Sequence, residues 1–237
     1  MQASPPPNAR VRSTPKRALL AWLSGKDSAW TLHLLRRSPG IEVAGLFTTV
    51  GQGSGRVAVH EVRAELLEAQ AAALGLALHK IPIPRLCPNA VYEAAIAEFI
   101  ARAKRESVTH VAFGDLFLED IRRYRERQFA GTGVEPLFPL WGLPTRALAE
   151  EMTASGLRAW ITCVDPRQAP REWAGMLFDP DFVRRIPEEV DACGERGEFH
   201  TFAFAGPMFR TPIATRVGEV AERDGFVYAD VLSCAAC

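Results

Sequence analysis

The residues best suited to do chemistry lie in a short segment after an apolar run. Residues 24–28 read Ser-Gly-Lys-Asp-Ser, between the apolar run 18–23 and a segment with helical spacing, 29–37. A glycine-containing turn between a buried strand and a helix N-terminus can bind phosphate through its free backbone N–H groups. Lys26 adds a full positive charge, and Ser24 and Ser28 add hydroxyl donors. The segment therefore predicts a phosphate-binding loop.

Asp27 is the unusual member of this loop, because a phosphate repels a carboxylate unless a cation lies between them. It predicts bound Mg²⁺, with Asp27 as a metal ligand. The loop is not a Walker motif, in which Gly-Lys is followed by Ser or Thr; here Lys26 is followed by Asp27. A chance turn in which a serine caps the helix is the alternative interpretation.

The composition narrows the class of protein. The chain has 237 residues, of which 48% are hydrophobic and 24% charged, and 28 Lys plus Arg balance 28 Asp plus Glu. These values are typical of a soluble globular protein with one large domain or slightly more. Zero net charge argues against nucleic acid as a partner, because such binders usually carry a basic excess. No apolar run reaches the length of a membrane span, so we expect no membrane interaction.

The chain ends and the cysteines indicate a compartment. We expect residues 1–16 to be a disordered tail, since they are rich in proline and basic residues and have no apolar signal core. Five cysteines, an odd number, suit free thiols in a reducing cytosol, which predicts a cytoplasmic protein. Cys234 and Cys237 have metal-like spacing, but a zinc site needs two further ligands, and we favour an accidental pair.

Strand and helix patterns alternate through the first 115 residues. Strands are predicted at 18–23, 41–49, 76–83 and 108–113, and helices at 29–37, 60–74 and, capped by Asn89, 91–104. This alternation predicts a parallel sheet with helices on both faces. Ligands bind such sheets at the carboxyl ends of the strands, where the 24–28 loop, Thr48 and Gly114-Asp115 lie. Together these features favour a nucleotide pocket.

A glycine-rich loop and a histidine lie beside this predicted edge. Gly51, Gly53 and Gly55 precede Arg56, and the loop suits either a mobile lid or a plain surface connection. His60 follows it and is a candidate for the same cavity, with a structural role as the alternative. We interpret the other histidines, His33, His79 and His110, as structural.

The second half of the chain shows mixed patterns. We expect helices at 116–129 and, capped by Thr145, through 155; a strand and turn at 135–142; strands at 157–164 and 202–204; and two small strands within 211–232. The charges of 116–129 are interpreted as a solvated helix face, and 166–187 has only a weak pattern. Residues 191–202 suit a binding loop or a charged surface turn. We divide the chain into 1–16, 17–130 and 131–237.

Residues 24–28 resemble the PP-loop of N-type ATP pyrophosphatases, whose common form is Ser-Gly-Gly-Lys-Asp-Ser. Three later motifs are similar to those of the diphthine–ammonia ligase family, namely GDLFLED at 114–120, PLWG at 139–142 and CGERGEFHTF at 193–202. The resemblance runs from about Ala18 to Asp230. Leu23 stands where the common loop has a second small residue. Phe199-His200 replaces a frequent Tyr-Glu pair, which points to a bacterial-type variant.

This resemblance implies a fold and a set of site residues. The fold would be α/β, with a Rossmann-like (HUP-type) parallel sheet and a smaller C-terminal α/β region that binds substrate. ATP binding is carried over to Ser24, Gly25, Lys26, Asp27, Ser28, Phe47, Thr48, Gly114 and Asp115. Catalytic roles are carried over to Lys26, Asp27, Glu195 and Glu198. Substrate binding is carried over to His60, Gly194, Glu195, Gly197, Glu198, His200 and Thr201.

The resemblance also implies a reaction with ATP and Mg²⁺. A substrate carboxylate, on a small molecule or a protein, would attack the α-phosphorus and release pyrophosphate; ammonia or an amine would then displace AMP. We find no built-in glutaminase, so the amine would come free or from a partner, and a homodimer is possible. Two alternatives stay open: a tRNA-modifying PP-loop enzyme, and an adenine-nucleotide-binding regulator without turnover.

Overall fold

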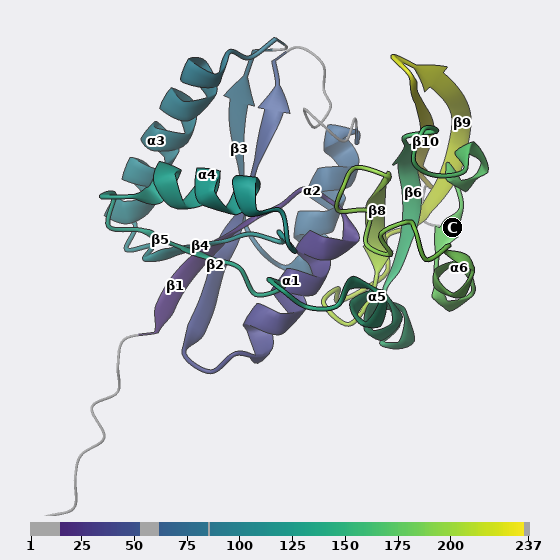
Figure 1. Cartoon of the computed structure of the whole chain (residues 1–237). Helices are drawn as coiled ribbons and strands as arrows, with labels where there is room; N and C mark the ends of the chain where they lie inside the picture. The colour runs from purple at the N-terminus through teal and green to yellow at the C-terminus, as the bar shows by residue number, and fades with distance from the viewer. Residues whose placement is uncertain (1–14, 53–61, 85, 235–237) are drawn as a thin grey trace, which may run out of the picture.

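A five-stranded sheet is formed by the N-terminal part of the chain (Figure 1). The structure, a computed structural model, describes residues 15–52, 62–84 and 86–234. The strands follow the order β3-β2-β1-β4-β5, with bounds β1 (Lys16–Ala21), β2 (Ile41–Gly51), β3 (Leu78–Ile83), β4 (His110–Ala112) and β5 (Glu135–Leu137). Every pairing between them is parallel, so the predicted α/β fold with a Rossmann-like sheet is confirmed.

Helices cover both faces of this sheet because its central strands are apolar on both sides. In β1, Leu19 packs into one buried cluster and Leu20 into the other. The helices α1 (Lys26–Arg37) and α2 (Ala64–Leu74) cover one face, and α3 (Asn89–Arg105) and α4 (Glu119–Phe129) cover the other (Figure 1).

A second sheet follows, and its pairings are antiparallel. Its central strand β6 pairs with β8 along one edge and with β7 and β10 along the other, while β9 pairs with β10. The bounds are β6 (Arg158–Val164), β7 (Leu177–Phe178), β8 (Phe199–Ala205), β9 (Thr215–Arg223) and β10 (Phe226–Ser233). The helices α5 (Thr145–Ala154) and α6 (Pro180–Arg185) and the short 3₁₀ helix Arg171–Trp173 accompany it. Residues 166–187, whose sequence pattern was weak, thus contain three short elements.

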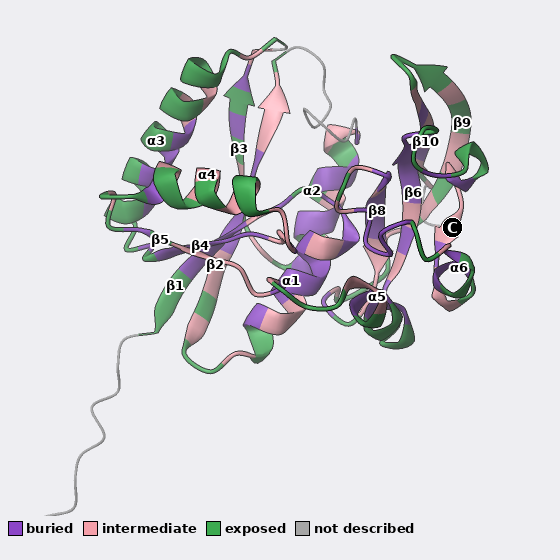
Figure 2. Cartoon of the chain, in the orientation of Figure 1, coloured by how far each residue is buried: buried purple, intermediate pink, exposed green. Residues whose placement is uncertain are grey.

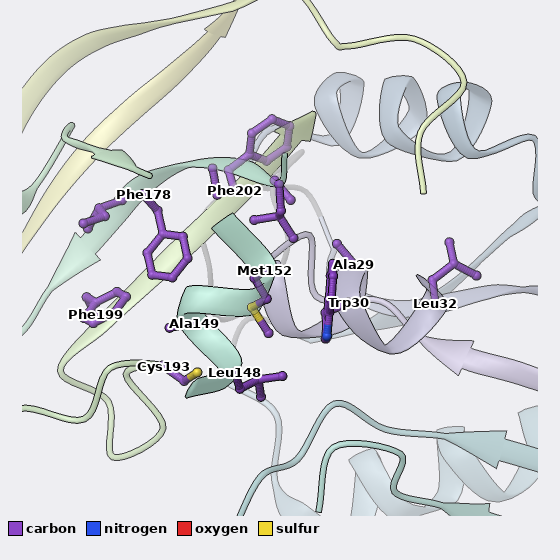
Figure 3. Close-up of a cluster of buried hydrophobic side chains, with 14 of the residues drawn as sticks. Ala29, Trp30, Leu32, Leu148, Ala149, Met152, Phe178, Cys193, Phe199 and Phe202 are labelled. Atoms are coloured by element: carbon purple, nitrogen blue, oxygen red, sulfur yellow. The ribbon is translucent and has the colours of Figure 1, made fainter. Parts of the chain in front are cut away.

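The helices α1 and α2 lie between the two sheets, and most of α1 and β8 is buried (Figure 2). One apolar cluster continues from Trp30 of α1, through Leu148 and Met152 of α5, to Phe202 of β8 (Figure 3). The Arg36 guanidinium donates to the carbonyl oxygens of Met208 and Leu74, at 2.8 and 2.6 Å. The two sheets therefore share a core.

The predicted helix caps were wrong at two positions. Asn89 and Thr145 are the first residues of their helices, and the capping positions are Pro88 and Pro144. Both prolines have the extended backbone that this position needs, which proline adopts without strain. The Thr145 hydroxyl donates to Asp191 Oδ2 instead, at 2.7 Å.

Other expectations differ at element ends or stay untested. The helix after the phosphate loop begins at Lys26 instead of residue 29, and α4 begins at Glu119, so 116–118 form a connection. Most of the expected tail, most of the glycine-rich loop with His60, and Cys237 lie outside the described residues. Because β5 belongs to the parallel sheet, that sheet extends beyond residue 130; the proposed division of the chain stays a prediction.

Among the residues that the structure describes, no helix combines the length and the apolar character needed to cross a bilayer.

Candidate active site between the two sheets

A cavity opens where the order of the parallel strands reverses. Its neighbours β1 and β4 continue into helices on opposite faces of the sheet, which is where ligands bind in folds of this kind. Four parts of the chain line it: the end of β1 with the first turn of α1, the end of β4, Arg125 of α4, and residues 193–201, which run from a loop into β8. The lining residues predicted as site residues are Gly25, Lys26, Asp27, Ser28, Gly114, Asp115, Gly194, Glu195, Gly197, His200 and Thr201.

Ser24 shapes the turn from behind the cavity wall. It is fully buried with φ of 64°, in the left-handed region that non-glycine residues seldom adopt. Its carbonyl oxygen accepts from Ala203 N–H at 2.9 Å and from Gln70 Nε2 at 2.8 Å. Its hydroxyl donates to the Leu23 carbonyl oxygen at 2.5 Å. The second sheet therefore holds this strained residue in place.

Two glycines allow backbone segments to approach the loop closely. A Cβ atom on Gly25 would lie 3.2 Å from both the carbonyl and hydroxyl oxygens of Thr201. A Cβ atom on Gly114 would lie 3.1 Å from the carbonyl carbon of Asp27. The Lys26 N–H group donates to Thr201 Oγ1 at 3.1 Å across the same gap. These close approaches bring β8 and the end of β4 against the first turn of α1.

The Lys26 ammonium is buried within the cavity wall and is 1% exposed. It lies 2.9 Å from Asp27 Oδ2 and also donates to the Cys193 carbonyl oxygen. The Phe178 and Phe199 rings lie 5.6 and 5.3 Å away, within the range of cation–π attraction. Burial alone lowers the pKa of Lys26, but attraction to Asp27 outweighs it, so the pKa lies above its ordinary value. Lys26 is therefore a positive charge in the cavity.

Asp27 has one carboxylate oxygen available for a ligand. Oδ2 pairs with Lys26, whereas Oδ1 is buried without a hydrogen-bond partner in the described part of the chain. Burial raises the pKa of Asp27 against the pull of Lys26, so the charged form gains from a nearby cation. The described residues contain no group of three or more His, Cys, Asp or Glu side chains that could hold a metal. A single carboxylate fits Mg²⁺, which proteins often hold with one or two carboxylates and substrate phosphates.

The loop 191–198 is held by its own carboxylates. Asp191 Oδ1 accepts from the N–H groups of Cys193 and Glu195, at 2.9 and 3.1 Å. Glu198 accepts from Asp191 N–H at 3.1 Å and from Arg196 N–H at 2.9 Å, and is 3% exposed. Glu198 was expected among the catalytic and substrate-binding residues. Its carboxylate instead accepts from backbone N–H groups of the loop, and it is not among the residues described as lining the cavity.

Glu195 is the acidic residue of this loop that reaches the cavity. Its Oε1 accepts from Leu116 N–H at 2.9 Å, where β4 continues toward α4. Burial raises the pKa of Glu195 to about 7; the Leu116 hydrogen bond opposes this rise, and the charges of Asp27 and Asp115 add to it. A carboxyl group with this pKa can take up and release protons near neutral pH.

His200 and Thr201 enter the cavity from β8 instead of the predicted loop. Burial, followed by repulsion from Lys26, lowers the pKa of His200 to about 4, so its imidazole is neutral at pH 7. Thr201 is 2% exposed and accepts from Lys26 N–H. Ser28 has a comparable local role, because its hydroxyl oxygen accepts from Leu23 N–H at 3.2 Å.

Phe47 and Thr48 line a second cavity beside the first. The two cavities share the wall residues Ala21, Leu23, Phe113 and Arg125. The predicted ATP residues are thus divided between two adjoining spaces, one polar and one rich in aromatic side chains.

Two residues at the site were missed in the sequence. Arg125 lines both cavities, with Nε 3.3 Å from Asp115 Oδ2 and its guanidinium carbon 4.4 Å from the centre of the Phe113 ring. Its signal was its spacing, four residues before buried Phe129, which puts both on one helix face. Gln70 is fully buried; its Nε2 donates to the carbonyl oxygens of Ser24 and Ala203, and no pattern in the sequence indicated it.

Comparison with known families bears on one wall of this site. Residues 144–229 match the family model described as the diphthamide synthase C-terminal domain. No curated protein matches the chain. The matched segment contains the loop 191–198 and the strand β8, which supply Glu195, His200 and Thr201. Of the three later motifs, the one at 193–202 lies within the matched segment, and the match supports the resemblance to the diphthine–ammonia ligase family through this segment. The bacterial-type variant stays a prediction.

Proposed function

We propose that the protein is an ATP-dependent ligase that adenylates a substrate carboxylate, releases pyrophosphate, and joins the acyl group to ammonia or an amine. One observation carries the proposal: a single cavity holds a charged lysine, a carboxylate with a free oxygen and a carboxyl group with a pKa of about 7. These are Lys26, Asp27 and Glu195. The family match of the C-terminal segment supports the same class of enzyme.

In the first half-reaction, negative charge accumulates on the departing pyrophosphate. The Lys26 ammonium and the N-terminal end of α1, with its positive end of the helix dipole, would bind these phosphates, since both are fixed in place before substrate arrives. Asp27 would hold Mg²⁺ through Oδ1, and the ion would supply further neutralisation of phosphate charge.

In the second half-reaction, the amine nitrogen forms a bond to the acyl carbon while the bond from that carbon to the AMP oxygen breaks. The attacking nitrogen must lose a proton, and the Glu195 carboxylate would accept it. The His200 imidazole would be neutral during this step, so it would add no second positive charge beside Lys26. The reacting carboxylate would therefore lie between Lys26 and Glu195.

The test is to incubate the protein with Mg-ATP, ammonium and a pool of carboxylates, and to measure AMP, pyrophosphate and products by mass spectrometry. We expect AMP and pyrophosphate in equal amounts together with an amidated carboxylate. Lys26→Ala should lower turnover by about 100-fold or more, because a preorganised charge is removed. Lys80→Ala is the control, since Lys80 pairs with Glu68 away from the cavity.

Other outcomes would decide against this function. AMP formation only in the presence of tRNA would indicate a tRNA-modifying enzyme. Tight binding of nucleotide without turnover would indicate a regulator. Unchanged turnover in Lys26→Ala would contradict the assignment of the phosphate loop.

A further inference from the structure

The cavity beside the phosphate site has aromatic and aliphatic walls. Phe47 comes from β2, Tyr92 and Ile96 from α3, Phe113 from the end of β4, and Phe129 from α4. Flat apolar walls of this kind suit a planar aromatic ligand, because every nucleobase has a π-face that stacks on such rings.

Two polar side chains in the same walls have atoms without a partner. Thr48 Oγ1 and Gln128 Nε2 are both buried, and neither has a hydrogen-bond partner among the described residues. Thr48 is 2% exposed. Buried polar atoms in proteins nearly always have partners, so two exceptions in one cavity indicate a ligand that supplies them.

The position of the cavity fits the rest of a nucleotide. It shares Ala21, Leu23, Phe113 and Arg125 with the cavity that contains Lys26 and Asp27. A nucleotide with its phosphates on the loop 24–28 would pass this shared wall with its ribose and reach the second cavity with its base. This step rests on the proposed function.

We propose that Gln128 and Thr48 read the base of the nucleotide and select adenine over guanine. A carboxamide presents a donor beside an acceptor, which matches the N7 acceptor and the N6 amino donor of adenine. Guanine presents two acceptors, O6 and N7, along the corresponding edge, so the amide can satisfy only one of them. The Thr48 hydroxyl supplies a further hydrogen bond within the cavity.

The experiment measures binding of α,β-methylene ATP and α,β-methylene GTP, with Mg²⁺, by calorimetry on the full chain. We expect the wild-type protein to prefer the adenine analogue by about tenfold or more. Gln128→Leu should weaken the adenine analogue by about tenfold and the guanine analogue by less, because adenine loses two hydrogen bonds to the amide and guanine loses one. Arg127→Leu is the control, since it places the same side chain at an exposed position of the same helix.

Two further variants keep the shape of the cavity. Gln128→Glu has nearly the same volume but replaces the amide donor with an acceptor that faces N7. Both analogues should therefore bind more weakly, and the guanine analogue should be affected at least as strongly, because both O6 and N7 are acceptors. Thr48→Val replaces the hydroxyl with a methyl group of similar size and should weaken the adenine analogue a few-fold. Both should fold as the wild-type protein does, as checked by circular dichroism.

The outcomes separate this inference from the proposed function. Equal affinity for both analogues, or equal weakening of both by Gln128→Leu, overturns the role of Gln128 even if the enzyme turns over ATP. A clear adenine preference that Gln128→Leu removes supports it even if ATP is never converted to AMP. Absence of binding of either analogue overturns both.

Discussion

Glu195 is a carboxyl group of the candidate site whose pKa, about 7, lies near neutral pH. Its carboxyl group is buried, and the negative charges of Asp27 and Asp115 lie near enough to raise its pKa further. Lys26 has the opposite property, because its attraction to Asp27 keeps it charged. One cavity thus contains a permanent cation and a group that exchanges protons near pH 7, which suits a reaction in which phosphate leaves and an amine is deprotonated.

For Glu195→Gln we expect turnover to fall by about 10²–10⁴-fold, the usual contribution of a general base. Because the base must be ionised, wild-type turnover should rise as pH increases through about 7, and the variant should lose this rise. The measurement is kcat against pH at a constant concentration of free amine. The control is Glu189→Gln at an exposed position, and an unchanged inflection in Glu195→Gln would contradict the assignment.

The same pKa gives a readout that does not need turnover. The folded protein keeps a proton on Glu195 between the ordinary pKa of 4.5 and about 7, where the unfolded chain releases it. The stability from this group is therefore present at low pH and is lost as pH rises through that window. Glu195→Gln should remove this part of the decline in unfolding free energy measured with urea.

At the scale of single residues, the sequence predicted those site residues that lie close together along the chain. The loop 24–28 was recognisable because its members are adjacent and its glycine and lysine have defined roles. Which of Glu195 and Glu198 reaches the cavity was not predictable, since they are three residues apart in an irregular loop. Gln70 was missed because its partners Ser24 and Ala203 lie 46 and 133 residues away.

The loop 191–198 is the element that brings Glu195 into the cavity with Lys26 and Asp27. Gly194 has φ of 70°, and a Cβ atom there would lie 2.7 Å from the Phe199 carbonyl oxygen. Gly197 has φ of 89°, but a Cβ atom there would meet open space. The two glycines therefore have similar backbone conformations but different surroundings.

We expect Gly197→Ala to lower the unfolding free energy by about 1–2 kcal/mol, the ordinary cost of a left-handed backbone for alanine. Gly194→Ala should cost more and should also lower turnover, because the backbone at Phe199 must move. Urea unfolding and AMP formation measure the two effects, with each variant as the other's control. Equal losses in both variants would show that the close approach to Phe199 does not constrain the loop.

At the scale of the whole molecule, the two sheets depend on each other. Their apolar cluster is continuous, and the buried side chain of Gln70 connects them. Its Oε1 accepts from Trp22 Nε1 at 2.8 Å, and its Nε2 donates to Ser24 and Ala203 carbonyl oxygens. Because Ala203 belongs to β8, this amide adds to the direct hydrogen bonds from Ala203 N–H to Ser24 and from Lys26 N–H to Thr201 that hold the loop 24–28 on the second sheet.

We expect Gln70→Leu to destabilise the whole chain in a single transition. Each buried group left without a partner costs about 1–3 kcal/mol, and the Trp22 indole N–H is the clearest case. Tryptophan fluorescence and far-ultraviolet circular dichroism during urea unfolding should shift together to lower urea. Gln52→Leu makes the same change at an exposed position and should have little effect. Separate transitions in the two signals would contradict a shared core.

The arrangement of the sheets was only half predictable. The alternation of strands and helices predicted the parallel sheet, because each connection contains a helix that must cover a face. The strands of the second sheet were expected, but their antiparallel pairing was not. β6 pairs with β8 across a long intervening segment, and β9 and β10 join the same sheet afterwards. Pairings this distant are set by the common core, which local patterns do not reveal.

The self-contained hydrogen bonding of the loop 191–198 has a consequence for protein engineering. Asp191 and Glu198 accept from backbone N–H groups within the loop, and the Glu195 carboxylate fastens the loop to Leu116 N–H. None of these hydrogen bonds uses the Arg196 side chain. Arg196 is exposed and has its backbone N–H already paired. A library that varies Arg196 while keeping Glu195, the two other carboxylates and Gly194 would change the outer surface of the loop on an unaltered backbone path. Redesign of the outer surface of this loop and preservation of the cavity behind it are thereby separable goals in this molecule.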